Sequence, residues 1–126
     1  MTDPASVARS YLDAFASGDP DAIASHVHDD FVNEHTSALG SGCTGREEYR
    51  RRLPDFLASF VGLRYETEQV IADGGAVAAA YRLTGSSDGN PVDLRGVMVF
   101  DIVDGRIARR TDYWDSLTFL RQTGNA

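Results

Sequence analysis

The spacing of hydrophobic residues along the chain changes near Gly62. Before this glycine, apolar residues recur every three or four positions, as they do on one face of an α-helix. The first such run consists of Val7, Ala8, Tyr11, Leu12 and Phe15. After the glycine, apolar and polar residues alternate, as they do in strands with one buried face. The pattern predicts helices in the first half of the chain and an antiparallel meander in the second.

Three helices are predicted before Gly62. Asp3-Pro4 and Asp19-Pro20 each combine a capping side chain with proline at the first helical position, so the first two helices begin there. A short strand-like segment, Phe31 to His35, follows them. Thr44 to Glu47 matches a capping box and predicts the start of the third helix.

Turn signals divide the second half into four strands and a closing helix. Asp73-Gly74-Gly75 and Asp104-Gly105 are typical of tight turns between antiparallel strands. A glycine-rich loop over residues 85–91 separates the middle two strands. Asp115 or Ser116 can cap a short C-terminal helix. The predicted strands are Leu63 to Asp73, Ala76 to Thr84, Val92 to Val103 and Arg106 to Trp114.

Helices followed by a long meander are typical of an α+β fold. We expect residues 1–126 to form a single domain in which a curved, cone-shaped sheet of about four to six strands, largely antiparallel, is covered by the three N-terminal helices and followed by the short C-terminal helix. If the helices fill the cone only partly, a pocket remains between them and the sheet, where small-molecule sites tend to form.

Composition narrows the range of partners. The chain has 126 residues, 42% of them hydrophobic, which is enough for one hydrophobic core. Its net charge of -7 argues against binding to nucleic acid or to an anionic membrane. Cys43 is the only cysteine, so no internal disulfide or zinc site of the usual spacing is expected. The first residues do not resemble a signal peptide, and no apolar run approaches the roughly 18 residues of a membrane span. A cytoplasmic location is therefore expected.

The strand Val92 to Val103 has two different faces. One is apolar throughout and is expected to face the core. The other mixes charged residues with Val97, Val99 and Val103. Such a face can be covered by a second copy of the chain, which predicts a homodimer through the outer face of the sheet, although exposed valines also occur on ordinary surfaces.

The last strand ends in the sequence RRTDYWD, which surrounds the only tryptophan of the chain. A large indole on a sheet is expected to face inward, and alternation then places Arg110 and Asp112 on the same inner face as Trp114. A buried carboxylate requires donors or a polar cavity. Asp115 lies on the opposite face, where it serves best as a helix cap. The candidate donors to Asp112 are Asn33, His35, Tyr81, Arg82 and Arg110.

The order of elements and the segments DDFVNEH, VMVFDIVDGRIARRTDYWD and SLTFLRQTG resemble the SnoaL-like polyketide cyclase branch of the nuclear transport factor two-like superfamily. The resemblance covers nearly the whole chain and implies a cone-shaped fold. Ketosteroid isomerases and limonene-epoxide hydrolases belong to the same superfamily, as do proteins without catalytic activity, so the fold by itself leaves the activity open.

The resemblance also implies roles for particular residues. Asp112 matches the acid/base carboxylate of the family. Asn33 and His35 fall where the epoxide hydrolases hold the attacking water, and Arg82 matches the arginine that orients their carboxylates. The second aspartate of the hydrolases corresponds to about Thr84 here, so the second carboxylate of their water-activating pair is missing. This departure favours proton transfer by Asp112, alone or with His35.

These residues support acid/base chemistry without a cofactor. A pocket formed by Phe15, Met98 and Trp114 would desolvate Asp112 and raise its pKa, which would make it a base for the carbon next to a carbonyl group. Polar neighbours would bind the enolate oxygen. We expect a small hydrophobic ketone or a polyketide-like substrate, with Asp112 and His35 catalytic. The residues expected to bind this substrate are Asn33, Tyr81, Arg82, Arg110, Trp114, Met98, Phe15 and Tyr11.

Other interpretations stay open at this point. Asp112 with Asn33 and His35 could activate water for epoxide hydrolysis, or the chain could be a binding or dimerisation module without turnover. Asp112 could also be a structural partner of an arginine, and His35 a core histidine bonded to the backbone. A metal site is not expected, because His26 and His28 lie in a polar connection that favours solvated side chains.

Overall fold

A computed structural model describes residues 3–125 of the chain. It confirms an α+β fold built on one six-stranded sheet, with the strand order β2-β1-β6-β5-β4-β3. Neighbouring strands are antiparallel except β1 and β6, which run parallel, so the sheet is mixed. The strands are β1 (Val27–His35), β2 (Cys43–Thr44), β3 (Val61–Asp73), β4 (Ala76–Ser87), β5 (Asn90–Val103) and β6 (Arg106–Trp114).

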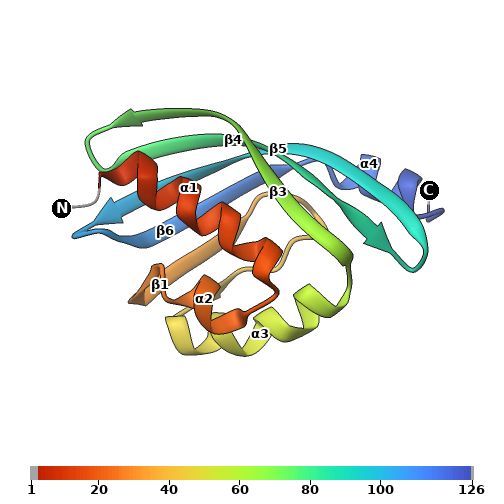
Figure 1. The fold of residues 1–126 in the computed structure, drawn as a ribbon, viewed down its shortest axis with the longest axis horizontal. Coiled ribbons are helices and arrows are strands. Elements are labelled where there is room, and N and C mark those ends of the chain that lie inside the picture. Colours follow the sequence, from red (N-terminus) through yellow and green to blue (C-terminus); the bar gives the residue numbers. More distant parts are fainter. Residues whose placement is uncertain (1–2, 126) are drawn as a thin grey trace.

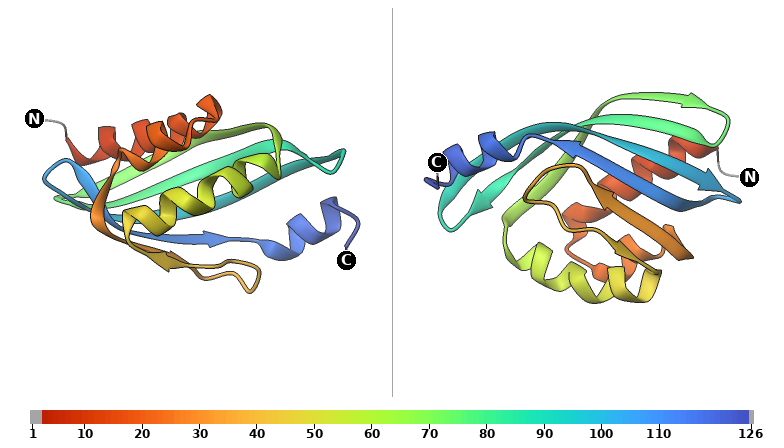
Figure 2. Two further views of the ribbon diagram at one scale, coloured as in Figure 1. Left: turned by 90° about the horizontal axis from the view of Figure 1, so that it is seen from below. Right: turned by 180° about the vertical axis from the view of Figure 1, so that it is seen from behind.

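The helices α1, α2 and α3 lie on one side of the curved sheet (Figures 1 and 2). Asp3 and Asp19 cap the first two helices through side-chain oxygens that accept backbone N–H groups, as predicted. α4 follows β6 at the far end of the sheet and is capped by Asp115, again as predicted. None of the described helices is long and apolar enough to cross a bilayer. The helical segments are α1 (Pro4–Ala14), η1 (Phe15–Ser17), α2 (Pro20–Ala24), α3 (Arg46–Ala58) and α4 (Ser116–Gln122).

The start of α3 differs from the prediction. Thr44 does not cap it; the capping position is Gly45, which makes no side-chain hydrogen bond and has a φ of 95°. Thr44 instead pairs with Val32 of β1, which places its backbone in the sheet. The left-handed turn from sheet to helix falls on the next residue, where glycine is the least strained choice.

Four strands, β1, β3, β4 and β5, are longer than the sequence suggested. β1 begins at Val27 rather than Phe31, because an irregularity between Val27 and Val32 interrupts the alternation that marks a strand. The predicted loop over residues 85–91 is mostly paired strand. Its turn is only Asp88-Gly89, where both residues have positive φ, as a two-residue hairpin turn requires.

The two faces of β5 are as predicted. Its inner side chains are buried and pack under α1 in a core that also contains Tyr11, Leu12 and Phe31. Its outer face is open to solvent in the monomer, with Val99 38% and Val103 51% exposed. On β6 a register shift leaves Ala108 as an extra residue opposite β5, so Ile107 is also fully buried. After this bulge the alternation resumes, and Arg110 and Asp112 face inward.

Candidate functional site

A cavity of about 340 Å³ lies between the inner face of the sheet and α3. Most of its wall is apolar and aromatic, including Phe15, Phe56, Phe60, Tyr65, Trp114 and Phe119. Five polar side chains of the wall lie together and contact one another, and these are Asn33, His35, Tyr81, Arg110 and Asp112. The wall also contains Ser41, Arg52, Ser59 and Ser87. An apolar pocket with a few converging polar groups is the usual form of a small-molecule site.

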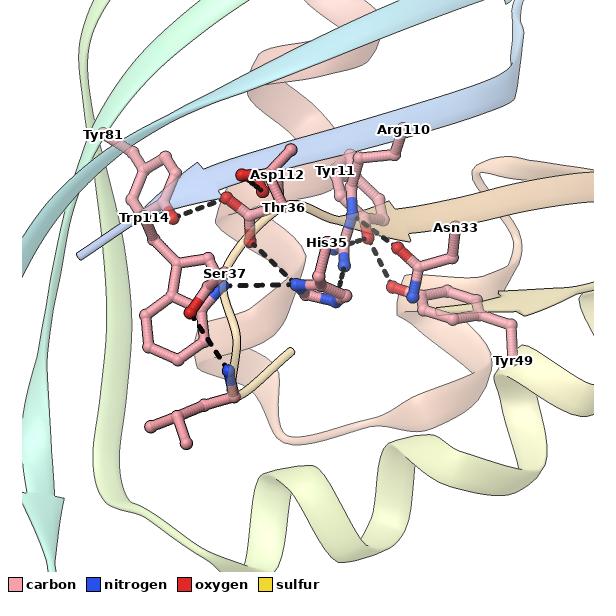
Figure 3. Close-up of polar contacts among 11 residues, drawn as sticks. Tyr11, Asn33, His35, Thr36, Ser37, Tyr49, Tyr81, Arg110, Asp112 and Trp114 are labelled. Atoms are coloured by element: carbon pink, nitrogen blue, oxygen red, sulfur yellow. Dashed lines mark hydrogen bonds and ion pairs between the residues drawn. The ribbon is translucent and has the colours of Figure 1, made fainter. Parts of the chain in front are cut away.

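Strand pairing brings these polar residues together. β1 and β6 run parallel, and their register sets Asn33 beside Arg110 and His35 beside Asp112. Residues two apart on a strand share a face, so all four side chains belong to the inner side of the sheet. Tyr81 reaches the group from β4, across β5 (Figure 3).

The carboxylate of Asp112 is the buried acid of this pocket. The residue is only 4% exposed, and its Oδ1 accepts a 2.7 Å hydrogen bond from the hydroxyl of Tyr81. Burial raises the pKa of Asp112, because the charged form loses its hydration, and the effect outweighs the opposing influences of Arg110 and of the Tyr81 hydrogen bond. The other carboxylate oxygen, Oδ2, lies 3.8 Å from Nδ1 of His35.

Arg110 is equally buried, at 4% exposed, and donates three hydrogen bonds. They run from Nε to Oδ1 of Asn33 (3.0 Å), from Nη1 to the hydroxyl of Tyr11 (2.6 Å) and from Nη2 to Nε2 of His35 (3.2 Å). The guanidinium also lies over the rings of Tyr11 and Tyr49, 5.8 and 5.9 Å from their centroids. Neutral acceptors and aromatic faces therefore hold this cation, and no described carboxylate oxygen lies within 4.0 Å of it.

His35 lies between Arg110 and Asp112 (Figure 3). Burial and the nearby charge of Arg110 lower the pKa of its imidazole to about 4, so the ring is neutral at neutral pH. The indole Nε1 of Trp114 donates a 3.3 Å hydrogen bond to Nδ1 of the same ring. A neutral histidine in this place can orient or bind a ligand, and its lowered pKa makes it a weaker base than an ordinary histidine.

Two glycines that sequence reasoning missed make room for these side chains. A Cβ atom on Gly96 would come within 2.5 Å of the Tyr81 hydroxyl, and one on Gly40 within 2.2 Å of Cβ of His35. The sequence contained a signal for Gly96, because a glycine at an inward position of a strand often marks a place where another group approaches the backbone closely. Tyr49 and Tyr65 were not among the expected site residues, and both line the pocket.

Three residues expected at the site lie outside the cavity wall. Arg82 is on the outer face of β4, where it forms hydrogen bonds of 2.8 and 2.6 Å with Asp93, so its expected place in the pocket was wrong. Alternation turns Tyr81 inward and its neighbour outward. Met98 is fully buried in the core and Tyr11 lies behind Arg110, so neither lines the cavity.

The histidines of the polar connection make structural contacts. His26 bonds to the hydroxyl of Ser10 and to the carbonyl oxygen of Ala22, and His28 bonds to the carbonyl oxygen of Val103. Within residues 3–125, no group of three or more His, Cys, Asp or Glu side chains is arranged to hold a metal ion.

Solved structures with the same fold come from several bacteria. A protein of ketosteroid isomerase-like fold from Catenulispora acidiphila, in complex with trimethylamine, is 19% identical, with a TM-score of 0.88 and coverage of 99% of this chain and 96% of that one. A proposed polyketide cyclase from Xanthomonas campestris is 25% identical, with a TM-score of 0.80 and coverage of 92% and 93%. An epoxide hydrolase of the limonene-epoxide hydrolase type from M. tuberculosis is 23% identical, with a TM-score of 0.81 and coverage of 96% and 92%.

No curated protein matches the chain significantly. The SnoaL-like domain matches residues 8–110, which include every strand from β1 to β5 and the start of β6. Because this match covers most of the chain, the chain belongs to the SnoaL-like domain family.

Proposed function

We propose that the protein is a cofactor-independent acid/base enzyme that transfers a proton at a carbon next to a carbonyl group. Its substrate in this proposal is a small hydrophobic ketone or a polyketide-like molecule. The observation that carries the proposal is Asp112, a buried carboxyl group with a raised pKa in the wall of a largely aromatic pocket.

The position of Asp112 suits a general base. An aspartate of ordinary pKa is too weak a base for a carbon acid, and burial moves its pKa towards neutrality, where it accepts protons better. Tyr81 holds Oδ1, while Oδ2 has no hydrogen-bond donor within 3.5 Å among the described residues. This leaves Oδ2 to take the proton, and positioned catalysis of this kind contributes roughly 100- to 10,000-fold to a rate.

The pocket walls support a hydrophobic substrate. Aromatic rings make up much of the cavity wall, and a volume of about 340 Å³ is in the range of small-molecule sites. The similarity to a proposed polyketide cyclase at 25% identity is consistent with a ketone of this kind.

The residues favour proton transfer over epoxide hydrolysis. Water activation by two carboxylates needs a second acid, and Asp112 is the one carboxylate among the described residues that line the pocket. Thr84, the position at which the resemblance placed the second acid, lies on the outer face of β4, because Leu83 beside it is buried and lines the pocket.

Exchange of carbon-bound hydrogen tests the proposal without knowledge of the product. Ketones of several sizes, including aromatic polyketide-like diketones, are incubated in D₂O with the protein, and loss of the α-proton signal is followed by NMR. We expect catalysed exchange for at least one ketone and a fall of about 100-fold or more in Asp112→Asn. Asp101→Asn, on the exposed face of β5, is the matched control and should keep the full rate.

Two results would contradict the proposal. Exchange at an unchanged rate in Asp112→Asn would exclude this residue as the base. Binding of ketones without exchange by the wild-type protein would instead support a binding module without turnover.

We also infer that the protein is a homodimer formed through the outer face of the sheet. Val97, Val99 and Tyr113 form an exposed apolar group on neighbouring strands there. Val99→Glu should then yield a monomer in size-exclusion chromatography with light scattering, while Arg9→Glu, at an exposed position of α1 on the opposite side of the sheet, should leave the dimer intact. A cytoplasmic location remains part of the proposal, on the basis of the single free cysteine.

A further inference from the structure

We infer that Arg52, on α3 at the mouth of the pocket, binds an anionic group of the ligand, of which a carboxylate is the simplest example. Arg52 belongs to a run of three arginines, residues 50–52, that the proposed function leaves without a role. The inference rests on the proposed function in one respect: it takes the ligand to be the ketone substrate, and it describes this substrate as a keto acid.

Arg52 lies on the face of α3 that lines the cavity. The other residues of this face are Tyr49, Leu53 and Phe56, at the spacing of three or four positions that places residues on one side of a helix. The side chain of Arg52 is 46% exposed, against 70% for Arg51, which does not line the cavity. A side chain that both lines the cavity and reaches solvent stands where the cavity opens.

Three hydrogen bonds hold the guanidinium group of Arg52 in this place. Nε donates to Oε1 of Glu48 (3.0 Å), and Nη1 donates to Oγ of Ser41 (3.2 Å) and to the carbonyl oxygen of Gly42 (2.9 Å). Nη2 makes no hydrogen bond within residues 3–125, so its N–H groups are available to a ligand. A donor that is already held in position loses little conformational entropy when a ligand binds.

The charges of the cavity wall favour an anion. Among the described residues that line the cavity, those charged at neutral pH are Arg52, Arg110 and Asp112, because His35 is neutral. The wall therefore has one net positive charge even when Asp112 is ionised, although the whole chain has a net charge of -7. A positively charged cavity in a negatively charged protein attracts anionic ligands to this one place.

Glu48 offsets only part of the charge on Arg52. Its Oε2 lies 2.7 Å from Nη2 of Arg51, and its Oε1 lies 3.0 Å from Nε of Arg52, so two guanidinium groups share one carboxylate. Arg50, the remaining arginine of the run, pairs separately with Asp21. Arg52 is thus the residue of the run that combines an incomplete counter-charge with a place in the cavity wall.

Arg110, the other cation of the wall, is less suited to a ligand carboxylate. It is only 4% exposed, and each of its three nitrogens already donates to a protein group. A carboxylate bound there would lose nearly all of its hydration, which is costly. A carboxylate at Arg52 would stay partly hydrated, so binding there avoids most of this cost.

The two polar ends of a keto acid would lie on opposite walls of the cavity. Arg52 is on α3, Asp112 is on the inner face of the sheet, and the cavity lies between them. With its carboxylate at Arg52, the ligand keeps this charge away from Asp112, whereas the reverse orientation would bring two carboxylates together. Arg52 would therefore select a keto acid and also the orientation that brings its carbonyl end to Asp112.

Matched acids and amides test the inference by calorimetry at neutral pH. The pairs are benzoate and benzamide, 6-acetyl-2-naphthoate and its amide, and anthracene-2-carboxylate and its amide. The two members of a pair have nearly the same shape, so the ratio of their dissociation constants isolates the effect of the charge. We expect at least one acid to bind about threefold to tenfold more tightly than its amide. This preference should shrink when sodium chloride is raised from about 0.05 M to about 0.5 M.

Substitutions in the arginine run locate the effect. Arg52→Gln should reduce the ratio to about one, and Arg52→Lys should keep part of the preference, because the charge remains without the planar guanidinium group. Arg51→Gln is the matched control: it removes the same charge beside the same glutamate but outside the cavity wall, so its ratio should stay close to that of the wild-type protein.

Several results would overturn the inference. An equal loss of preference in Arg51→Gln would mean that the general charge of α3 attracts the acids. Weaker binding of both members of a pair in Arg52→Gln, at an unchanged ratio, would mean that Arg52 only anchors Ser41 and Gly42. Acids that bind no more tightly than their amides in all three pairs, or that do not bind at all, would also contradict a site for an anion.

Asp112→Asn separates this inference from the proposed function. It removes the base and leaves Arg52 in place, so the preference for acids should remain while exchange of α-protons is lost. Lost exchange in this variant, with no preference for acids in the wild-type protein, would support the proposed function and overturn the keto acid. A preference for acids in a wild-type protein that catalyses no exchange would support the anion site and contradict the proposed function.

Discussion

Tyr81 and Asp112 are joined by a 2.7 Å hydrogen bond although they lie on strands that do not pair. β5 runs between them, with Gly96 beside Tyr81 and Met98 beside Asp112. The tyrosine ring crosses β5 at Gly96, where a side chain would occupy the space of its hydroxyl. A glycine on a third strand therefore allows the tyrosine to hold the carboxylate.

Gly96→Ala should displace Tyr81 and weaken its hydrogen bond to Asp112. The new Cβ would lie 2.5 Å from the hydroxyl and 2.7 Å from the carbonyl oxygen of Tyr113, so we expect a loss of about 1–3 kcal/mol in the free energy of unfolding, measured with urea. The substitution should cost less in a Tyr81→Phe background, where the hydroxyl is absent. Equal costs in the two backgrounds would show that the backbone contact alone is responsible.

Tyr81→Phe should destabilise the protein by about 1–3 kcal/mol at neutral pH, because it leaves a buried carboxylate without its donor. The pKa of Asp112 should rise further, since the Tyr81 hydrogen bond lowers it. Exchange of α-protons would then reach its maximum at higher pH than in the wild-type protein. Tyr113→Phe is the matched control: this residue is 49% exposed on the outer face, and neither the stability nor the pH of maximal exchange should change.

Arg110→Gln should raise the pKa of both Asp112 and His35. The guanidinium charge lowers both values, in the first case by favouring the carboxylate and in the second by opposing the imidazolium. NMR titration of the two side chains measures the shifts. Arg109→Gln removes a neighbouring arginine that points to the outer face and pairs with Glu34, and it should leave both values in place. A fall in either pKa in Arg110→Gln would contradict this assignment of charges.

The stability of the protein between pH 4 and 6.5 should reflect two opposite titrations. The pKa of His35 falls from 6.5 to about 4 on folding, so the folded state binds its proton less tightly and stability is lost as pH falls through this window. The pKa of Asp112 is raised above 3.8, so its contribution has the reverse sign and stability falls as pH rises towards the folded pKa.

Single substitutions should separate the two contributions. The free energy of unfolding is measured with urea at a series of pH values. Asp112→Asn removes the contribution that falls with pH, so stability should rise more steeply from pH 4 to 6.5 than in the wild-type protein. His35→Gln removes the contribution that rises with pH, so stability should rise less steeply or fall. His28→Gln, on the same strand as His35 but outside the pocket, is the control for loss of a histidine. Identical slopes in all three variants would mean that neither group titrates as assigned.

Local sequence patterns were sufficient for most of the elements. Asp3, Asp19 and Asp115 cap helices as predicted, because a cap depends only on neighbouring backbone N–H groups. The inner and outer faces of β5 and the inward direction of Asp112 follow from alternation, which is equally local. Patterns failed at the start of β1, where the chain departs from regular alternation, and at Thr44, where the predicted helix cap instead pairs with Val32 in the sheet.

The constellation around Asp112 depended on contacts between distant segments. Arg82 and Tyr81 were both candidates in the sequence, and only the pairing of β4 in the sheet decided that the tyrosine faces the pocket. The parallel register of β1 and β6 set Asn33 beside Arg110 and His35 beside Asp112.

The sequence by itself therefore determined the fold class, the inward carboxylate and the family resemblance, since all three rest on local spacing and on residue identity. Only the tertiary structure decided which polar groups meet that carboxylate and which nitrogen of His35 faces Arg110. The physical reason is that hydrogen bonds and pKa values depend on distances of a few ångströms between segments as many as 99 residues apart, as for Tyr11 and Arg110.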